Sequence, residues 1–304
     1  MPTLNKKPRV VVMVVARMGS TRLPGKSMTD LCGHPVIWHV LQIAKNIRGA
    51  GDICLATTDM PEDDPLAVVA QAEGIHCARG DAEKVLDRLH GAAVKMNADV
   101  IIEVGGDCPL LDPEIVSSAL EDFLASPCDY LCNYEPPTFP EGMDVNIVSM
   151  SAIQKAWENA VAPSQRVHPF SYLTYHPEEF AIRNYAMTPD LSRHHWSLDF
   201  PEDIGLLRIA YERLWKSGNR IHLNELTHLL DADILFAAKD KELLRPKVSH
   251  AFWNSPGIVR DMHSDVVELT QSAFISQGKG DFSLAKQCYA EALRIVERLH
   301  SAAK

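Results

Sequence analysis

Short apolar runs alternate with segments of helical periodicity over the first third of the chain. The first run, Val10–Val15, is apolar throughout, as expected of a strand buried on both faces of a parallel sheet. Residues 36–47 then carry apolar side chains at helical spacing, and the alternation continues with strand-like runs at Asp52–Thr57, Ile75–Ala78 and Ala98–Val104. This pattern predicts an α/β fold with a doubly wound, mostly parallel sheet.

The alternation of strands and helices is less regular in the middle of the chain and is followed by a segment predicted to be only helical. Further strands are predicted in four segments: Cys128–Tyr134, Val145–Val148, Phe180–Tyr185 and His194–Leu198. A proline-rich loop at residues 135–144 either shapes a pocket or forms a plain connection. The alternation of strand and helix ends at residues 217–219, and residues 223–246 are predicted to be helical.

A separate helical tail is predicted at residues 265–304, after a mixed linker from Pro246 to Pro256. Ala285, Tyr289 and Ala292 follow a Gly-Asp-Phe turn at the spacing typical of the second helix of a tetratricopeptide unit. One such unit cannot bury its own apolar face, so the tail is expected to dock on the main domain or on a partner. We therefore predict an α/β domain at residues 8–246 and a helical, tetratricopeptide-like tail at residues 265–304.

A small, basic loop, ARMGSTRLPGK, follows the first apolar run. It combines turn-forming residues with three cations, Arg17, Arg22 and Lys26. At the carboxyl end of a parallel strand, such a loop can direct backbone N–H groups and fixed positive charge at a polyphosphate. A solvated basic loop is the alternative. The sequence is neither a Walker A loop nor a G-x-G-x-x-G fingerprint, which weakens an assignment as an ATPase or a dehydrogenase.

Two aspartates follow predicted strands and are candidate ligands of Mg²⁺. Asp107 comes after two glycines at the end of the fourth run, opposite the basic loop. Asp112 immediately precedes Pro113 and is the expected cap of the next helix, which leaves Asp107 without a capping task. Asp199 stands before a helix of its own, so it is either a metal ligand or an N-cap.

The composition indicates a globular protein and argues against several classes of binding protein. Hydrophobic residues make up 46% of the 304 residues, as in an ordinary globular protein with a sizeable core. The net charge of −10 argues against a general binder of nucleic acid or anionic membranes, and the longest apolar run is too short to span a bilayer. Seven scattered cysteines without a metal-type pair indicate reduced thiols. A cytoplasmic protein is therefore expected.

Five segments together resemble the spore coat polysaccharide biosynthesis cytidylyltransferase family, which is akin to the CMP-KDO synthetases of lipopolysaccharide synthesis. The segments are ARMGSTRLPGKSM, RGDAEKVLDR, VGGDCPLLDPEIV, FPEGMDVNIVS and HHWSLDFPEDIGLLR. The resemblance covers roughly Arg9–Tyr211 and leaves the helical tail outside. It implies a fold of the nucleotide-diphospho-sugar transferase type. It also implies an Mg²⁺-dependent transfer of CMP from CTP to an acidic sugar, a 3-deoxy-2-keto or related compound, with release of pyrophosphate.

The resemblance also implies roles for individual residues. The nucleotide site comprises Ala16, Arg17, Met18, Gly19, Ser20, Arg22, Lys26, Arg79, Gly80, Asp81 and Gly106. Arg22, Lys26 and Asp107 are the implied catalytic residues, and Asp107 and Asp199 the implied metal ligands. The sugar side is expected to include Glu141, Asp144, Arg166 and His168. Phe200 stands where the family usually has Thr, a departure that leaves the neighbouring carboxylate unaltered.

Two other functions remain open at the level of sequence. One is another nucleotidyltransferase or a glycosyltransferase of the same fold, although a donor that already carries a diphosphate needs no triphosphate cradle. The other is a non-enzymatic scaffold that works through the helical tail, which the intact set of Arg22, Lys26, Asp107 and Asp199 disfavours. A homodimer and a protein partner for the tail are further expectations.

Overall fold

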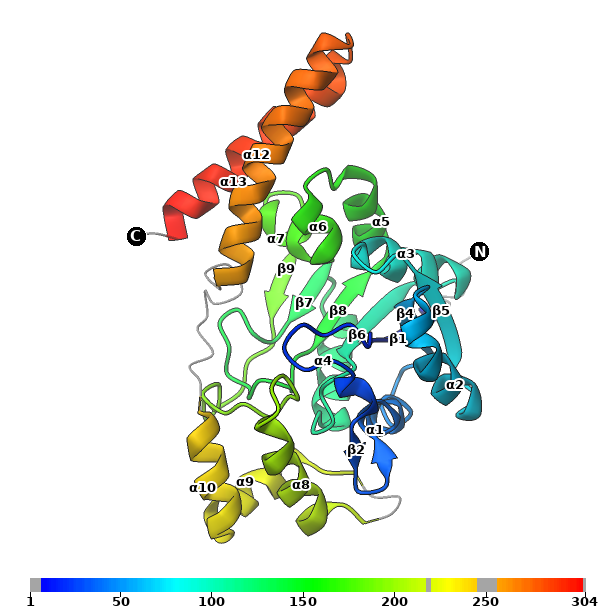
Figure 1. The fold of residues 1–304 in the computed structure, drawn as a ribbon, viewed down its shortest axis with the longest axis vertical. Coiled ribbons are helices and arrows are strands. Elements are labelled where there is room, and N and C mark those ends of the chain that lie inside the picture. Colours follow the sequence, from blue (N-terminus) through cyan, green and yellow to red (C-terminus); the bar gives the residue numbers. More distant parts are fainter. Residues whose placement is uncertain (1–6, 217–219, 245–255, 303–304) are drawn as a thin grey trace.

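The computed structural model describes residues 7–216, 220–244 and 256–302, and a seven-stranded sheet forms its centre (Figure 1). The strand order is β5-β4-β1-β6-β8-β7-β9. The strands are β1 (Val10–Val15), β4 (Asp52–Thr58), β5 (His76–Gly80), β6 (Val100–Gly105), β7 (Tyr130–Cys132), β8 (Asn146–Ser149) and β9 (Ile182–Asn184). Only β8 runs antiparallel to its neighbours within this sheet. The predicted doubly wound, mostly parallel sheet is confirmed.

Helices cover both faces of the sheet. One face packs against α1 (Val36–Ala44), α2 (Asp64–Ala72), α4 (Pro113–Ala125) and α8 (Asp203–Leu214), with α9 (Leu223–Ala232) and α10 (Ile234–Leu243) beyond α8. The other face packs against α3 (Val85–Lys95), α5 (Met150–Asn159), α6 (Pro163–Val167) and α7 (Ser171–Tyr175). Val12 and Val14 of β1 enter the first core and Val11 and Met13 enter the second, which explains why this strand is apolar throughout.

Two predicted elements differ in the structure. The segment at residues 194–198 is not a strand and makes only one bridge, between His195 and Glu141. It is held by side chains instead: His194 Nδ1 and Trp196 Nε1 contact the Asp240 carboxylate at 2.7 and 2.8 Å. The predicted helix at 223–246 is two helices, α9 and α10, because the Asp233 carboxylate caps a new start. The end of that prediction at 246, and the predicted linker up to residue 255, lie outside the described residues.

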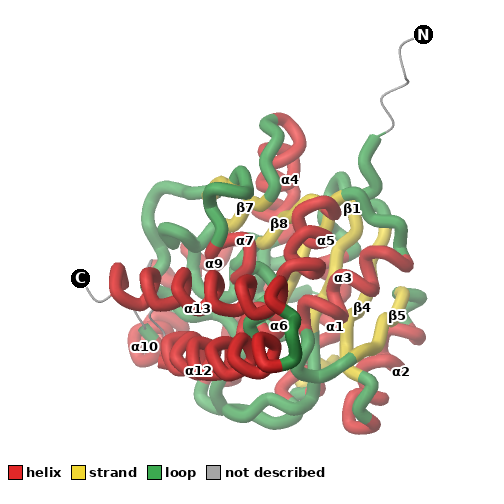
Figure 2. The backbone as a smooth tube through the Cα atoms, turned by 90° about the horizontal axis from the view of Figure 1, so that it is seen from above, coloured by secondary structure: helices red, strands yellow, loops and turns green. Residues whose placement is uncertain are grey.

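The tail is a hairpin of α12 (Pro256–Gly278) and α13 (Phe282–Ala302), which lie side by side in both views (Figures 1 and 2). Its apolar seam packs onto Ala162 and Tyr175, beside α6 and at the end of α7. Polar contacts reinforce this junction, including a 3.1 Å pair between His176 Nε2 and a Glu291 carboxylate oxygen and an ion pair of Arg294 with Glu178. Within this chain, the tail therefore docks on the α/β body.

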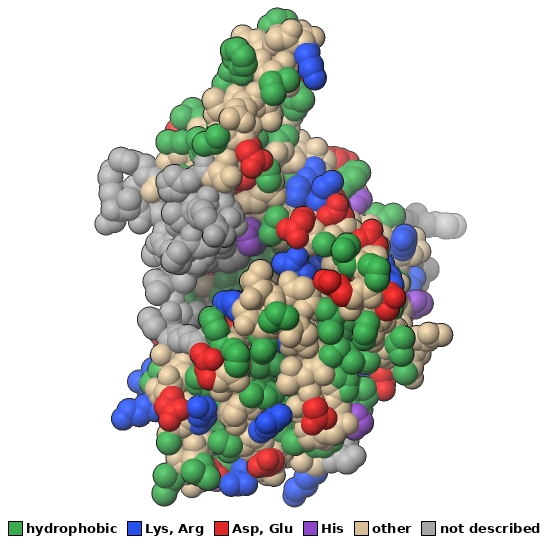
Figure 3. Space-filling view, in the orientation of Figure 1, with side chains coloured by type: hydrophobic (Ala, Val, Ile, Leu, Met, Phe, Trp, Pro, Cys, Tyr) green, Lys and Arg blue, Asp and Glu red, His purple; other side chains and the backbone are tan. Residues whose placement is uncertain are grey.

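The far end of the hairpin projects beyond the body and is apolar. Phe274 and Phe282, near the turn between the two helices, leave 73% and 67% of their surface exposed. Hydrophobic side chains are visible over this protruding tip in the space-filling view (Figure 3). The tail therefore uses its base, not its tip, to contact the body.

Candidate active site

The basic loop leaves β1 at the carboxyl edge of the sheet and folds back on itself. The carbonyl oxygen of Met18 accepts hydrogen bonds from the backbone N–H groups of Ser20 (2.8 Å) and Gly25 (2.9 Å). Oδ1 of the buried Asp63 accepts the N–H of Met18 at 2.6 Å. These bonds hold the loop as an arch that leads into the 3-10 helix η1 (Lys26–Met28).

Four of the predicted charged residues converge beside this arch. Lys26 Nζ contacts Oδ2 of Asp107 at 2.5 Å and Oδ1 of Asp199 at 3.1 Å. Arg22 Nη2 contacts the same Oδ1 of Asp199 at 2.7 Å. Residues separated by up to 177 positions in the sequence thus form one cluster of two cations and two anions.

Asp107 is carried close to the basic loop by the two glycines before it. A Cβ at Gly106 would lie 2.6 Å from the Cβ of Ala16 and 3.0 Å from the carbonyl oxygen of Val15, so only glycine permits this approach of β6 to β1. As predicted, Asp112 caps the next helix, accepting the N–H of Glu114 at 2.9 Å. The carboxylate of Asp107 remains available to the cluster.

A second acid positions Asp199. Oδ2 of Asp203 accepts the backbone N–H groups of Asp199 (2.8 Å) and Phe200 (2.7 Å), and the Ser197 hydroxyl donates to Oδ2 of Asp199 at 2.8 Å. Helix α8 begins at Asp203 with Glu202 as its N-cap residue, so Asp199 does not cap it. The ring of Phe200 lies 4.9 Å from Cζ of Arg22, a cation–π contact that a threonine could not make.

The charges in the cluster stabilise one another. Burial disfavours the charged form of Lys26, but Asp107 and Asp199 outweigh this and raise its pKa. Burial likewise opposes ionisation of Asp199, yet Lys26, Ser197 and Arg22 together lower its pKa. The lysine is therefore a cation and Asp199 an anion at neutral pH.

The donor set suits a divalent cation that also binds phosphate. The carboxylates of Asp107 and Asp199 already share one cationic atom, Lys26 Nζ, and carboxylate oxygens are ligands that Mg²⁺ accepts. No three His, Cys, Asp or Glu side chains among residues 7–216, 220–244 and 256–302 group as a metal site. Two carboxylates are enough for Mg²⁺ when substrate phosphates and water supply the other ligands.

The predicted residues of the third strand loop lie further from the cluster and bond to their own surroundings. Arg79 Nε and Nη2 donate to the carbonyl oxygens of Thr58 (2.7 Å) and Met60 (2.8 Å), so Arg79 fixes the segment that follows β4. Oδ1 of Asp81 accepts the N–H of Glu83 at 2.8 Å. Arg17 reaches towards this loop and contacts Oε1 of Glu83 at 3.3 Å. Arg17 therefore connects the arch to the loop that follows β5.

The four residues predicted on the sugar side fall into two groups. Glu141 and Asp144 belong to the proline-rich loop before β8, where the backbone of Glu141 pairs with residues 194 and 196. A Cβ at Gly142, whose φ is +91°, would lie 2.7 Å from the backbone nitrogen of Ser197, so the loop packs tightly beside that segment. Arg166 and His168 lie at α6, where Arg166 Nη1 pairs with Asp87 at 2.7 Å.

Sequence analysis missed three residues that shape this edge. They are Asp63, Arg88 and Tyr211. Arg88 is buried, its Nη1 donates to the carbonyl oxygen of Asp81 at 2.9 Å, and its Nε has no partner in the described part of the chain. Burial, and secondarily the charge of Arg17, lower the pKa of Arg88. Arg88 could have been selected from the sequence, because an Asp-Arg pair at 87–88 follows shortly after the third predicted strand.

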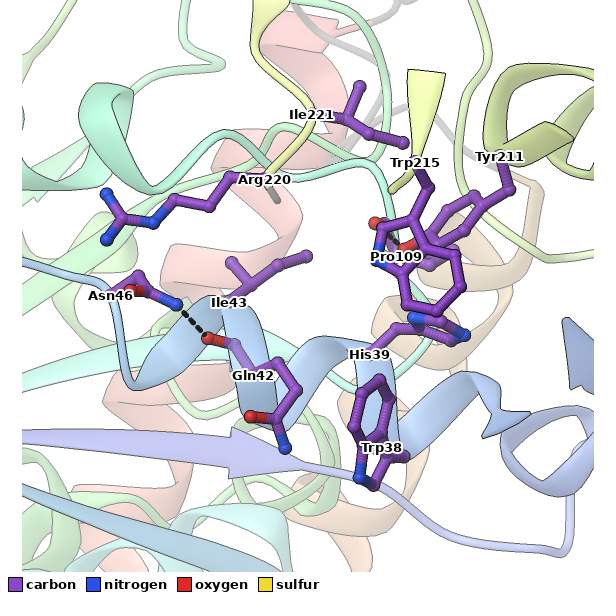
Figure 4. Close-up of a pocket in the computed structure, with 10 residues that line it drawn as sticks. All are labelled: Trp38, His39, Gln42, Ile43, Asn46, Pro109, Tyr211, Trp215, Arg220 and Ile221. Carbon is purple, nitrogen blue, oxygen red and sulfur yellow. Dashed lines mark hydrogen bonds between the residues drawn. The ribbon is translucent and has the colours of Figure 1, made fainter. Parts of the chain in front are cut away.

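Tyr211 supports the loop of Asp107 from behind. Its hydroxyl donates to the carbonyl oxygen of Pro109 at 2.7 Å. Both residues line a cavity of about 110 Å³ between α1 and α8, in which aromatic rings gather on one side (Figure 4). The lining residues are Trp38, His39, Gln42, Ile43, Asn46, Pro109, Tyr211, Trp215, Arg220 and Ile221. None of the four residues of the charged cluster lines this cavity.

Comparison with known families decides the class of this site. The family model described as cytidylyltransferase matches residues 11–236, which include the whole charged cluster. The chain belongs to the cytidylyltransferase family. This cytidylyltransferase is therefore a nucleotidyltransferase enzyme, and the resemblance inferred from the five sequence segments is confirmed.

Three relatives define the extent of the similarity. The spore coat polysaccharide biosynthesis protein SpsF of Bacillus subtilis is 28% identical over 73% of this chain and 94% of its own. A 3-deoxy-manno-octulosonate cytidylyltransferase of Trichlorobacter lovleyi is 37% identical over 39% of this chain, but the match covers only 46% of that enzyme. A solved cytidylyltransferase of Leptospira borgpetersenii, 25% identical, superimposes with a TM-score of 0.70 over 76% of this chain and 96% of its own.

The match to the family model ends at residue 236, so the hairpin of α12 and α13 lies outside it. No helix in the described part of the chain is long and apolar enough to cross a membrane.

Proposed function

We propose that this cytidylyltransferase transfers CMP from CTP to an acidic sugar, a 3-deoxy-2-keto or related compound, with Mg²⁺ as cofactor and pyrophosphate as the second product. The observation that carries the proposal is the convergence of Arg22 and Lys26, from the loop after β1, on Asp107 and Asp199. The names of two relatives, a spore coat polysaccharide protein and a 3-deoxy-manno-octulosonate cytidylyltransferase, support a role in surface polysaccharide or glycoconjugate synthesis. Such a reaction would take place in the cytoplasm, where CTP is available.

The proposed chemistry needs positioning and charge compensation rather than a nucleophile on the protein. The arch that contains Ala16, Met18, Gly19 and Ser20 would present backbone N–H groups to the triphosphate, and Gly106 allows the opposite strand to approach. Arg22 and Lys26 would neutralise the charge that moves onto pyrophosphate as it leaves. Bound to Asp107 and Asp199, Mg²⁺ would supply Lewis-acid stabilisation of the phosphate oxygens.

The remaining predicted residues form two groups, one on each side of the sheet edge, and we assign one group to each substrate. Arg17, Arg79, Gly80 and Asp81 would border the nucleoside, on the side of β4 and β5. The sugar would lie on the side of β8 and β7, near the loop of Glu141 and Asp144 and the α6 residues Arg166 and His168. Of these, Arg166 would have to exchange its contact with Asp87 for the sugar carboxylate.

The function is tested by measuring pyrophosphate release with each nucleoside triphosphate against a panel of sugar acids and neutral sugars. We expect release with CTP, Mg²⁺ and a sugar acid, and much weaker activity with ATP or GTP, because the family model that matches this chain is that of the cytidylyltransferases. Titration calorimetry with CTP and ATP provides an independent measure of selectivity. Equal affinity and equal turnover for the two nucleotides would remove the cytidylyl assignment and leave the fold unaffected.

We further propose that the helical tail serves association or docking rather than chemistry. Its base contacts α6 and α7, and its exposed apolar tip projects away from the sheet (Figure 1). A homodimer and a heterologous protein are the two partners considered.

Removing residues 256–304 should therefore leave kcat largely intact while it changes the assembly state or partner binding. Light scattering and steady-state turnover measure the two effects. Phe274→Ser with Phe282→Ser alters only the exposed tip, so this variant should also change assembly or partner binding and leave kcat intact. A truncated protein that is folded and unchanged in assembly, but inactive, would place the tail in the active site.

A further inference from the structure

A polar cluster lies on the sheet face beneath α3, α5 and α7, just below the edge that carries Asp107. Asn146 Nδ2 donates to Oε2 of Glu103 at 2.8 Å, and the hydroxyls of Tyr130 and Tyr134 donate to Oδ1 of Asn146 at 2.6 and 2.7 Å. The cluster joins β6 to β8 and β7 on a face whose core is otherwise apolar. A carboxyl group at such a place is costly to bury and requires a compensating role or partner.

Glu103 lies two residues before the end of β6, towards the edge of the sheet that carries Asp107. It lies on a central strand, paired with Met13 of β1 on one side and Asn146 of β8 on the other. Its neighbours Ile102 and Val104 point to the opposite face and are fully buried, whereas Glu103 is partly exposed. Tyr134, Asp144 and Asp107 are partly exposed as well. Glu103 as a residue is thus incompletely buried, while its carboxylate lies within the polar cluster.

We propose that Glu103 is the base that accepts the proton of the sugar hydroxyl. The inference rests on the proposed function above and adds a catalytic residue to it. The acceptor O–H bond breaks and its proton passes to the Glu103 carboxylate, while the oxygen forms a bond to the α-phosphorus of CTP. The bond from the α-phosphorus to the bridging oxygen breaks, and pyrophosphate leaves with that electron pair. Glu103 later returns the proton to water.

The environment of Glu103 suits this task. Burial raises the pKa of Glu103 to about 7, the hydrogen bond from Asn146 opposes the increase, and the negative charges of Asp107 and Asp144 add to it. Met13 of β1, which pairs with Glu103, carries no charge, and burial raises the pKa of the two tyrosine hydroxyls well above their usual value. A base whose pKa lies near the working pH is largely deprotonated, and therefore able to accept a proton, and still binds the proton strongly enough to favour its transfer.

Glu103→Gln tests the assignment, because the amide keeps the volume and can still accept the hydrogen bond from Asn146. We expect kcat to fall by about a hundredfold or more, as for loss of a general base, with the KM for CTP unchanged. The wild-type rate should rise with pH through a pKa near 7, since the carboxylate is the active form, and this limb should be absent in the variant. Glu121→Gln, an exposed glutamate on α4, is the control and should behave as wild type.

Glu103→Asp keeps the carboxylate but shortens its reach, so it should be slower and still show the pH-dependent limb. This variant also decides the question if melting curves show that Glu103→Gln is unfolded. Wild-type kcat and pH profile in Glu103→Gln, or loss of the limb in a folded Glu103→Asp, would overturn the inference alone. A wild-type enzyme that releases no pyrophosphate from CTP with any sugar would overturn the proposed function and the inference together.

Discussion

Asp107→Asn is expected to lower turnover by about a hundredfold or more, the loss typical of removing one group that stabilises charge in a transition state. Asparagine keeps the size of the side chain but carries no charge to attract Mg²⁺ or to hold Lys26, whose Nζ lies 2.5 Å from the aspartate. Pyrophosphate release at saturating CTP measures the effect. Asp30→Asn, at an exposed carboxylate on the small hairpin of β2 (Asp30–Leu31) and β3 (His34–Pro35), is the control and should remain fully active.

The double variant Asp107→Asn with Asp199→Asn tests whether the two carboxylates act as a unit. Both contact Lys26, so the loss of one already disables the arrangement that the other supports. The combined loss should therefore be much smaller than the product of the single losses. Multiplicative losses, or full activity in Asp107→Asn, would show that the two residues do not share one ion.

The central strand β1 and the alternation of strands with helices could be predicted from local pattern. Val10–Val15 is apolar at every position because both faces of the strand are buried. This pattern can be recognised from the segment's own sequence, without knowing which distant residues pack against it. The segment at residues 194–198 depends instead on a distant partner for its conformation. Its alternating apolar and polar residues match a strand, but His194 and Trp196 bond to Asp240, a partner that no local window contains.

The same distinction applies to the candidate site. Arg22, Lys26 and Asp107 could be selected because each follows a buried strand, and strand ends meet at one edge of a parallel sheet. The supporting acids could not be selected in this way. Asp63 and Asp203 occupy ordinary positions at helix starts. Each accepts a backbone N–H from a segment whose position is known only in the folded structure.

Lys26→Met should separate the charge of the lysine from the carboxylates that surround it. Lys26 Nζ lies between Asp107 and Asp199, and only 12% of this side chain is exposed. In the variant, two neighbouring carboxylates lose their shared cation, and removing one partner from a partly buried ion pair leaves uncompensated charge. A divalent cation can then occupy the space between them without competing with the ammonium group.

We therefore expect Lys26→Met to bind Mn²⁺ more tightly than the wild type in the absence of nucleotide, and yet to turn over about a hundredfold more slowly or worse. Titration calorimetry with Mn²⁺ gives the first quantity and pyrophosphate release the second. The melting temperature of the variant should rise more with Mg²⁺ than that of the wild type, since an ion bound only by the folded state stabilises it. Lys45→Met, which removes the lysine that follows α1 and pairs with Glu73 after α2, is the matched control and should change neither quantity. Unchanged Mn²⁺ affinity together with normal turnover would mean that the lysine neither occupies the cation position nor takes part in the transfer.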